Sequence, residues 1–140
     1  MSKNDASPTA SAKVEHLAPS DWQKTRSFSP AIVTEGGRTV WLAGQTTLTD
    51  LDGNDIAGKF EPQARTIFEL IRRTLQRVGG DLKNIVTMTV FINDPRNGDR
   101  FVQIRSEYFP EGRCPCSALV TVSNFARPGC VIEIQAVAVI

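Results

Sequence analysis

The chain has 140 residues, a formal net charge of +1 and 41% hydrophobic residues. This length and composition fit one globular domain with a sizeable core, because two domains would leave each with too little interior. The near-neutral charge disfavours a nonspecific nucleic-acid binder, and no stretch approaches the roughly 18 apolar residues of a membrane span. We therefore expect neither nucleic acid nor a membrane as a partner.

Three cysteines, Cys114, Cys116 and Cys130, lie in the last third of the chain. Because an odd number of cysteines does not suit a disulfide framework, we expect a reducing, cytoplasmic compartment. The Cys-x-Cys pair lacks the further cysteine or histidine ligands that a metal site would need nearby. We expect no metal and no organic cofactor.

We expect residues 1–22 to form a mobile N-terminal arm and residues 23–140 a single domain. The arm is rich in Ser, Ala, Lys and Asp and shows no sustained hydrophobic period. Beyond it, two short β-prone runs at residues 31–34 and 39–46 flank a glycine turn. A turn that supplies positive φ between such runs predicts a β-hairpin. The polar segment 47–58 follows as a loop.

Hydrophobic periodicity then predicts two helices. In residues 61–78 apolar side chains recur at helical spacing with charged residues on the other side, which is typical of an amphipathic helix. Residues 99–109 form a second, shorter helix that Pro110 ends. Strands are predicted at residues 82–92, 118–123 and 131–139. This order indicates an α+β fold with both helices on one face of a mixed sheet.

The last predicted strand is apolar on both faces. Its two sides carry Ile132, Ile134, Ala136 and Ala138 on one and Val131, Val137 and Val139 on the other. Since a domain of this size has no elements left for the second face, we expect a homo-oligomer, which would bury that face at roughly 25 cal/mol per Å² of apolar area. Trp41 is expected in the core, with the subunit interface as the alternative.

Glu133 is the strongest functional candidate. It is the one carboxylate in the apolar run Val131–Val139, and an isolated buried carboxylate is too costly to leave unpaired. The carboxylate must therefore be paired, hydrated in a pocket, or protonated. The alternative is a glutamate whose side chain points into water from an edge strand.

An ordered set of short segments resembles the Rid family of reactive-intermediate deaminases, also called YjgF-type proteins. These segments are Phe28–Ala31, Leu42–Gln45, the helix from Gln63, Val86–Ile92 with Asp94, Glu107–Pro110 and Val131–Ala136. The resemblance runs from about Phe28 to Ile140. It implies a chorismate-mutase-like α+β fold assembled as a homotrimer, with clefts between neighbouring subunits.

The resemblance also assigns roles to residues. In deaminating members an arginine binds the substrate carboxylate and a glutamate on the last strand positions water, and by motif that glutamate is Glu133. The arginine position holds Ser117, which cannot supply a bidentate, charge-assisted contact. Phe28 stands where tyrosine is usual, and Ala43 where serine is common before Gly44. The chain is thus similar to the branches without the arginine, and its cleft is expected to favour a neutral ligand.

Several residues are candidate substrate contacts, and each has a structural alternative. Arg113 could swing into the cleft or be a solvated loop residue. Cys116, like Cys114, could be a nucleophile beside Arg113 or an inert thiol. Ser117 could hydrogen-bond the ligand or be a small residue accepted where the arginine was lost. Gly44 could offer backbone contacts or mark close packing. Whether a neighbouring subunit's Arg26, Arg105 or Arg127 replaces the arginine stays open.

The leading hypothesis is a cofactor-independent hydrolase or deaminase that acts on a carbon–nitrogen bond of an imine, enamine or carbamate-like small molecule. Glu133 would position the water at an intersubunit cleft. The alternative is a noncatalytic small-molecule-binding trimer, a metabolite sensor. A third possibility, an endoribonuclease, is disfavoured because His16 is the only histidine and no aromatic platform interleaves with basic residues.

Overall fold

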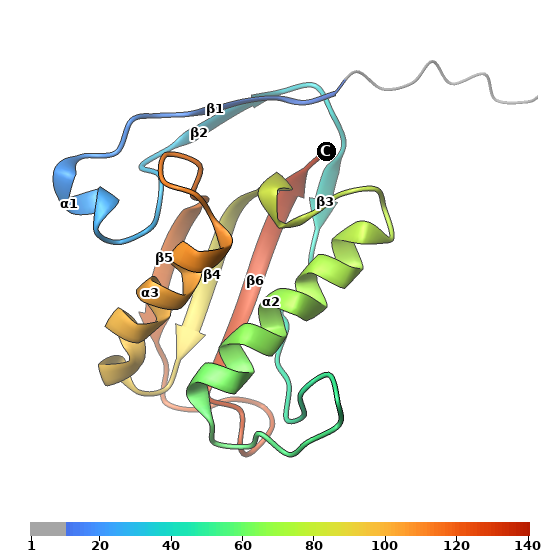
Figure 1. Cartoon of the computed structure of the whole chain (residues 1–140), viewed down its shortest axis with the longest axis vertical. Coiled ribbons are helices and arrows are strands. Elements are labelled where there is room, and N and C mark those ends of the chain that lie inside the picture. Colours follow the sequence, from blue (N-terminus) through green and yellow to red (C-terminus); the bar gives the residue numbers. More distant parts are fainter. Residues whose placement is uncertain (1–10) are drawn as a thin grey trace, which may run out of the picture.

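The computed structural model describes residues 11–140. A four-stranded sheet with the order β3-β6-β4-β5 carries both long helices on one face (Figure 1). Strands β4 and β5 are parallel, and β6 is antiparallel to both β3 and β4. The bounds of these elements are β3 (Thr39–Trp41), α2 (Phe60–Gln76), β4 (Ile85–Ile92), α3 (Gly98–Tyr108), β5 (Cys116–Thr121) and β6 (Ile132–Val139). The expected α+β fold, a mixed sheet with helices, is confirmed.

Smaller elements complete the fold. A separate two-stranded sheet joins β1 (Lys13–His16) to β2 (Ile32–Glu35), and the short helix α1 (Asp21–Lys24) lies between them in sequence. Two 3-10 turns, η1 (Leu82–Asn84) and η2 (Pro95–Asn97), precede β4 and α3. In the described residues no helix is long and apolar enough to cross a membrane.

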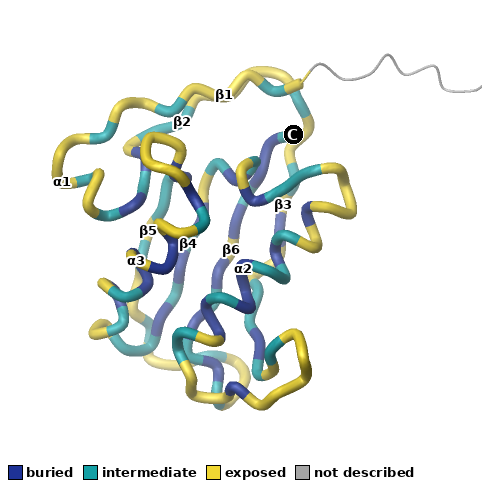
Figure 2. Tube along the Cα trace, in the orientation of Figure 1, coloured by how far each residue is buried: buried dark blue, intermediate teal, exposed yellow. Residues whose placement is uncertain are grey.

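The core lies between the helices and the sheet, where Figure 2 shows the buried positions. Phe68 of α2 stacks on Phe101 and Tyr108 of α3, with ring centroids 6.1 and 4.5 Å apart. On β6 the buried side chains are Ile132, Ile134, Ala136, Ala138 and Val139. The helical periods and the strand alternation thus meet in one apolar layer, as expected from amphipathic elements.

The expected hairpin between residues 31–34 and 39–46 is wrong. Strand β2 pairs with β1, and β3 pairs with β6. The glycine turn does exist, with φ of 68° at Gly36 and 74° at Gly37. A Cβ at Gly37 would lie 2.5 Å from the carbonyl oxygen of Ile140, and Arg38 exchanges backbone hydrogen bonds with Ile140. The strand that follows the turn, β3, therefore lies beside the end of β6 and does not pair with β2.

The N-terminal segment is more structured than the expected arm. Residues Lys13–His16 form β1 and Asp21–Lys24 form α1, which Ser20 caps by accepting a hydrogen bond from the Gln23 backbone N–H at 3.3 Å. Residues 1–10 of the expected arm lie outside the described residues. The domain that was expected to begin at residue 23 thus includes β1 and α1.

The face of the sheet opposite the helices stays largely accessible. Trp41, expected in the core, is 79% exposed and pairs with Val137 of β6 on this face. Phe91 and Glu133 are register partners and both are half-buried there, while Val120 of β5 is 39% exposed. We refer to this surface as the open face. Its apolar side chains are those for which the sequence predicted a covering partner.

Candidate functional site

Glu133 lies on the open face in the middle of β6, opposite Phe91 of β4. It is half-buried, and among residues 11–140 its carboxylate forms no ion pair or hydrogen bond, so that the oxygens reach solvent. The sequence required a buried carboxylate at this position to be paired, hydrated or protonated. The structure leaves this carboxylate unpaired and open to solvent on a partly covered surface.

Gly44 forms the wall beside this carboxylate. An alanine Cβ at position 44 would lie 3.1 Å from Cδ of Glu133 and 3.3 Å from both carboxylate oxygens. The neighbouring Gln45 fixes the segment to β6, because its N–H donates to the Ile134 carbonyl at 2.8 Å and its carbonyl accepts from the Ile134 N–H at 3.1 Å. Ala43 and Gly44 are exposed. A glycine here gives the carboxylate room that any side chain would remove.

Ser117 lies on the other face of the sheet from Glu133. It pairs with Met88, whereas Glu133 pairs with Phe91, and positions 88 and 91 of one strand point to opposite faces. The Ser117 hydroxyl accepts a hydrogen bond from Nη1 of Arg105 at 2.5 Å. The position where the resemblance expects an arginine is therefore in contact with a guanidinium group from α3.

Arg105 is buried, with 2% of its surface exposed. Its Nε donates to the Ser27 hydroxyl at 3.2 Å and its Nη2 to the Arg26 carbonyl at 3.0 Å. The guanidinium also lies over the Phe101 ring, 5.1 Å from the centroid. Among residues 11–140 it forms no ion pair with a carboxylate. Burial is the main cause that lowers the pKa of Arg105 to about 10; Cys114 opposes the shift and the positive charge of Arg26 adds to it.

A cavity of about 330 Å³ opens beside Arg105. Two aromatic rings, Trp22 and Phe28, contribute to its lining and meet edge to face with centroids 6.1 Å apart. Ser117 and Arg26 line it as well. We refer to it as the arginine cavity. It brings together two residues predicted from the sequence, Phe28 and Ser117, with two of the arginines considered as replacements, and it does so within one chain.

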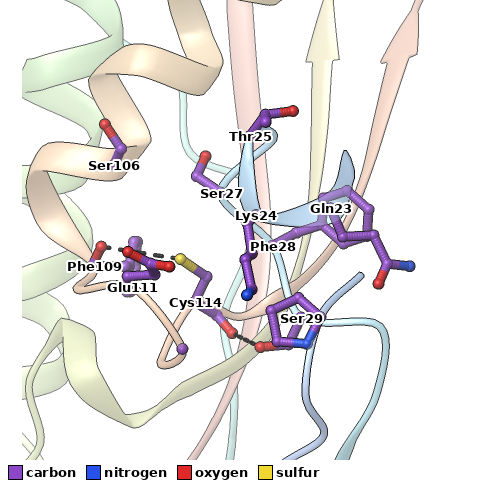
Figure 3. A pocket seen from close by; sticks show the side chains of 12 residues that line it. Gln23, Lys24, Thr25, Ser27, Phe28, Ser29, Ser106, Phe109, Glu111 and Cys114 are labelled. Atoms are coloured by element: carbon purple, nitrogen blue, oxygen red, sulfur yellow. Dashed lines mark hydrogen bonds between the residues drawn. The ribbon is translucent and has the colours of Figure 1, made fainter. Parts of the chain in front are cut away.

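A second cavity, of about 350 Å³, is also lined by Phe28 (Figure 3). Cys114 lines it, but its thiol donates weakly to the carbonyls of Phe109 and Pro110, at 3.9 and 3.6 Å. Burial raises the pKa of the Cys114 thiol more than the positive charge of Arg105 lowers it, and the charge of Glu111 adds to the rise. A neutral, hydrogen-bonded thiol is a poor nucleophile, so the arrangement favours the inert alternative.

The remaining predicted contacts lie apart from one another. Arg113 is exposed and lines a third cavity that His16 also borders, away from Glu133 and the arginine cavity. Cys116 begins β5, and by strand alternation it faces the opposite side from Ser117. Burial raises the pKa of the Cys116 thiol. Among residues 11–140 no group of three or more His, Cys, Asp or Glu side chains could hold a metal ion.

The importance of Arg105 was only partly visible in the sequence. Together with Phe101 and Tyr108 it follows the helical spacing that marks the buried side of α3, so a charged residue interrupts an apolar stripe there. A charge at a buried helix position is rare unless it is paired or functional. That interruption was the available signal.

Comparison with known proteins decides the family. The family model described as Endoribonuclease L-PSP matches residues 19–140. The chain belongs to this family, the YjgF/Rid family. The resemblance seen in the sequence is thereby confirmed.

Curated relatives and solved structures agree with this membership. The 3-aminoacrylate deaminase RutC of Acinetobacter baylyi is 32% identical over 107 residues, which cover 75% of this chain and 82% of the relative. A RutC family protein of Pyrococcus horikoshii is 29% identical over 111 residues, covering 79% and 85%. The Rid family protein YyfB of Yersinia pestis, whose function is unknown, superposes with a TM-score of 0.78 at 21% identity, over 91% of this chain and 98% of that chain. The last similarity shows the fold alone.

Proposed function

We propose that this Rid family protein is a small hydrolase or deaminase that acts on a carbon–nitrogen bond of an imine, enamine or carbamate-like molecule. The observation that carries the proposal is the unpaired Glu133 carboxylate beside Gly44 on the open face. The similarity to a relative named 3-aminoacrylate deaminase supports the class of reaction. No metal or organic cofactor takes part in this proposal.

Glu133 would act on water. A carboxylate that is not engaged in an ion pair can accept a proton from a water molecule and direct the water oxygen at an electrophilic carbon. With an imine, the C–O bond forms as the C=N π electrons move to nitrogen, and Glu133 passes the proton that it took from water to that nitrogen. In the collapse of the carbinolamine, Glu133 takes the hydroxyl proton and gives it to the nitrogen as the C–N bond breaks. The products are ammonia and a carbonyl compound, and Glu133 is again a carboxylate.

We further propose that the open face is the subunit interface of a homotrimer and that the reaction takes place in a cleft between subunits. Trp41 and Val120 are exposed on this face in the single chain. The half-buried Val137 and Phe91 lie between them on the same face, and an extended apolar surface of this kind marks an interaction surface. Burial by neighbouring copies would cover these side chains and enclose Glu133, which would exclude bulk water from the site.

The other candidate substrate contacts divide into those beside Glu133 in the same chain and those away from it. Ala43 and Gly44 are adjacent to Glu133 in the same chain, so we propose their backbone as the floor of the site. Cys116, Arg113, Phe28 and Ser117 would reach the substrate only across a subunit boundary, because none of them lies beside Glu133 in the chain. Phe28 and Ser117 have the stronger support, since they share one cavity.

The direct test is turnover by the protein and its Glu133→Gln variant on a panel of 2-imino and 2-enamino acids and carbamates, with ammonia release as the readout. Removal of a general base is expected to lower turnover by about 10²- to 10⁴-fold. Gln135→Ala is the matched control, since Gln135 is exposed on the same strand and face. Equal rates for wild type and Glu133→Gln would exclude the mechanism.

A noncatalytic, ligand-binding trimer is the second candidate, and Ser117 in place of the arginine favours it. Saturable binding without product formation across the panel would support this alternative. The endoribonuclease reading gains nothing from the structure. His16, the only histidine, hydrogen-bonds Ser29 and the Cys114 carbonyl through Nδ1, at 3.1 Å each, and so holds β1 to the loop before β5.

A further inference from the structure

We propose that the third cavity, the one that Arg113 and His16 border, binds a small phosphate monoester whose organic part is apolar. The cavity has a volume of about 500 Å³ and is formed by β1, η1 and the end of α3 with the loop that follows it. We refer to it as the β1 cavity. None of its lining residues belongs to the open face or to the arginine cavity. The inference therefore goes beyond the reaction proposed for Glu133 and does not depend on it.

Strand β1 and the residue before it form one wall. Ala12, Val14 and His16 line the β1 cavity, whereas Lys13 and Glu15 line a different one. This follows from the geometry of a strand, in which successive side chains point to opposite sides. Val14 is 43% exposed, so the wall presents apolar surface that no side chain covers. The other walls are η1 and the loop after α3, over which β1 passes in Figure 1.

The β1 cavity carries positive charge without a matching acid. Lys83 and Arg113 line it and are exposed, and within residues 11–140 neither of them forms an ion pair. No aspartate or glutamate of the described chain lines the cavity. A hollow lined by charges of one sign focuses the electrostatic potential and concentrates ions of the opposite sign. The expected ligand is therefore an anion.

Two half-buried polar side chains beside these cations are already held in place. The Oδ1 atom of Asn84 accepts a hydrogen bond from the Asp81 backbone N–H at 2.8 Å, which leaves the amide N–H groups of Asn84 to donate. The Nδ1 atom of His16 contacts the Ser29 hydroxyl and the Cys114 carbonyl at 3.1 Å each, which leaves Nε2 for a ligand. Side chains that are fixed before binding lose little entropy when the ligand arrives.

The two cations favour a phosphate over a carboxylate. A phosphate monoester carries about 1.5 to 2 negative charges at neutral pH and offers three acceptor oxygens. It can therefore match Lys83 and Arg113 together and still accept from the Asn84 amide. Lysine binds phosphate as a point charge and arginine binds it through its planar fork. A carboxylate, with one charge, would leave one of the two cations unmatched.

The apolar walls and the volume define the organic part of the ligand. Tyr108, Phe109 and Pro110 line the cavity with Val14, and the Tyr108 ring is fixed by stacking on Phe68 with centroids 4.5 Å apart. A volume of about 500 Å³ lies within the range of about 300 to 1,000 Å³ for small-molecule sites, which are mostly apolar with a few polar groups. Inorganic phosphate would match the charge but leave the apolar walls in water.

Phenyl phosphate is the probe, and two compounds are its controls. Phenyl sulfate keeps the ring and the shape but carries one negative charge, and inorganic phosphate keeps the charge without the ring. In calorimetry at about pH 7.5, where the monoester is mostly a dianion, we expect phenyl phosphate to bind roughly tenfold or more tightly than either control. Equal affinity for inorganic phosphate would mean an adventitious ion only. That result, equal affinity for phenyl sulfate, or no saturation by about 10 mM phenyl phosphate overturns the proposal.

Variants locate the site. Lys83→Gln and Arg113→Gln should each weaken phenyl phosphate about tenfold, because each removes one charge-assisted contact. Lys13→Gln is the matched control and should bind as the wild type does, since Lys13 is exposed on β1 but lines a different cavity. Glu133→Gln should also leave the affinity unchanged, and a changed affinity there would place the probe at the other site. Unchanged affinity in both Lys83→Gln and Arg113→Gln overturns the inference.

Discussion

Replacing Arg105 by methionine should leave the free energy of unfolding within about 1 kcal/mol of the wild type. A buried, hydrogen-bonded arginine would ordinarily be regarded as a structural residue whose loss is severe. We expect otherwise, because the guanidinium carries a burial penalty that no carboxylate offsets. Methionine retains most of the apolar stem of the arginine side chain.

The penalty and the hydrogen bonds are of similar size. The fall in the pKa of Arg105 from its ordinary value to about 10 corresponds to about 3.5 kcal/mol of unfavourable burial, at roughly 1.4 kcal/mol per unit. Three hydrogen bonds contribute about 1 kcal/mol each. After the substitution Ser27 keeps its bond to the Val102 carbonyl at 2.9 Å. Ser117 borders the cavity and can bond water. The two effects therefore nearly cancel.

Urea unfolding at pH 7 is the appropriate assay. The folded-state pKa of Arg105 lies below the unfolded-state value, so the burial penalty is complete below pH about 10. It decreases as the pH rises above about 10, where the unfolded chain still holds the proton that the folded chain has released. Ile104→Ala, at the adjacent fully buried position, should cost about 2–5 kcal/mol and calibrates the measurement. A loss of 3 kcal/mol or more in Arg105→Met would refute the reasoning and make Arg105 a structural residue.

Three further outcomes are expected. Gly44→Ala should fold normally but lose about tenfold or more in turnover, since the new Cβ displaces the Glu133 carboxylate that lies 3.1 Å away. Gly98→Ala is the control, because its Cβ would meet only a side-chain methyl at 3.6 Å. Equal activity in the two variants would count against a role of Gly44 beside the carboxylate. Trp41→Ser should shift the protein toward monomer in analytical ultracentrifugation. Trp22→Ser should not, because Trp22 is 65% exposed but lies off the open face. An unchanged mass for Trp41→Ser contradicts the proposed interface. Burial raises the pKa of the Cys114 thiol, so this thiol should react with iodoacetamide at pH 7.5 at least tenfold more slowly than free cysteine. The reaction should become faster as the pH rises. A rate equal to that of free cysteine would show that the thiol is reactive.

Helices and long strands were predictable because their signal is local. The apolar period in residues 61–78 reappears as α2 (Phe60–Gln76), and the alternation in 131–139 as β6 (Ile132–Val139). Each pattern depends on residues a few positions apart that share one face. The family could also be recognised, since its motifs are short and ordered along the chain.

Pairing and exposure could not be predicted in the same way. The Gly36-Gly37 turn has the positive φ that a hairpin would need, but the choice of strand partner depends on contacts such as Arg38 with Ile140, at opposite ends of the domain. Strand alternation placed Trp41 on one face without indicating which face the helices cover. Ser117 and Arg105 likewise met only when α3 packed against β5.

The bond between Arg105 and Ser117 also constrains how this protein could be changed. An arginine introduced at position 117 would bring a second cation against the first, so restoring the usual residue of deaminating relatives should be harmful unless position 105 becomes neutral at the same time. Positions 105 and 117 are thus coupled, and a double-mutant cycle between them would show strong non-additivity. In engineering or in evolution, replacing serine by arginine at position 117 therefore requires a matching change at position 105.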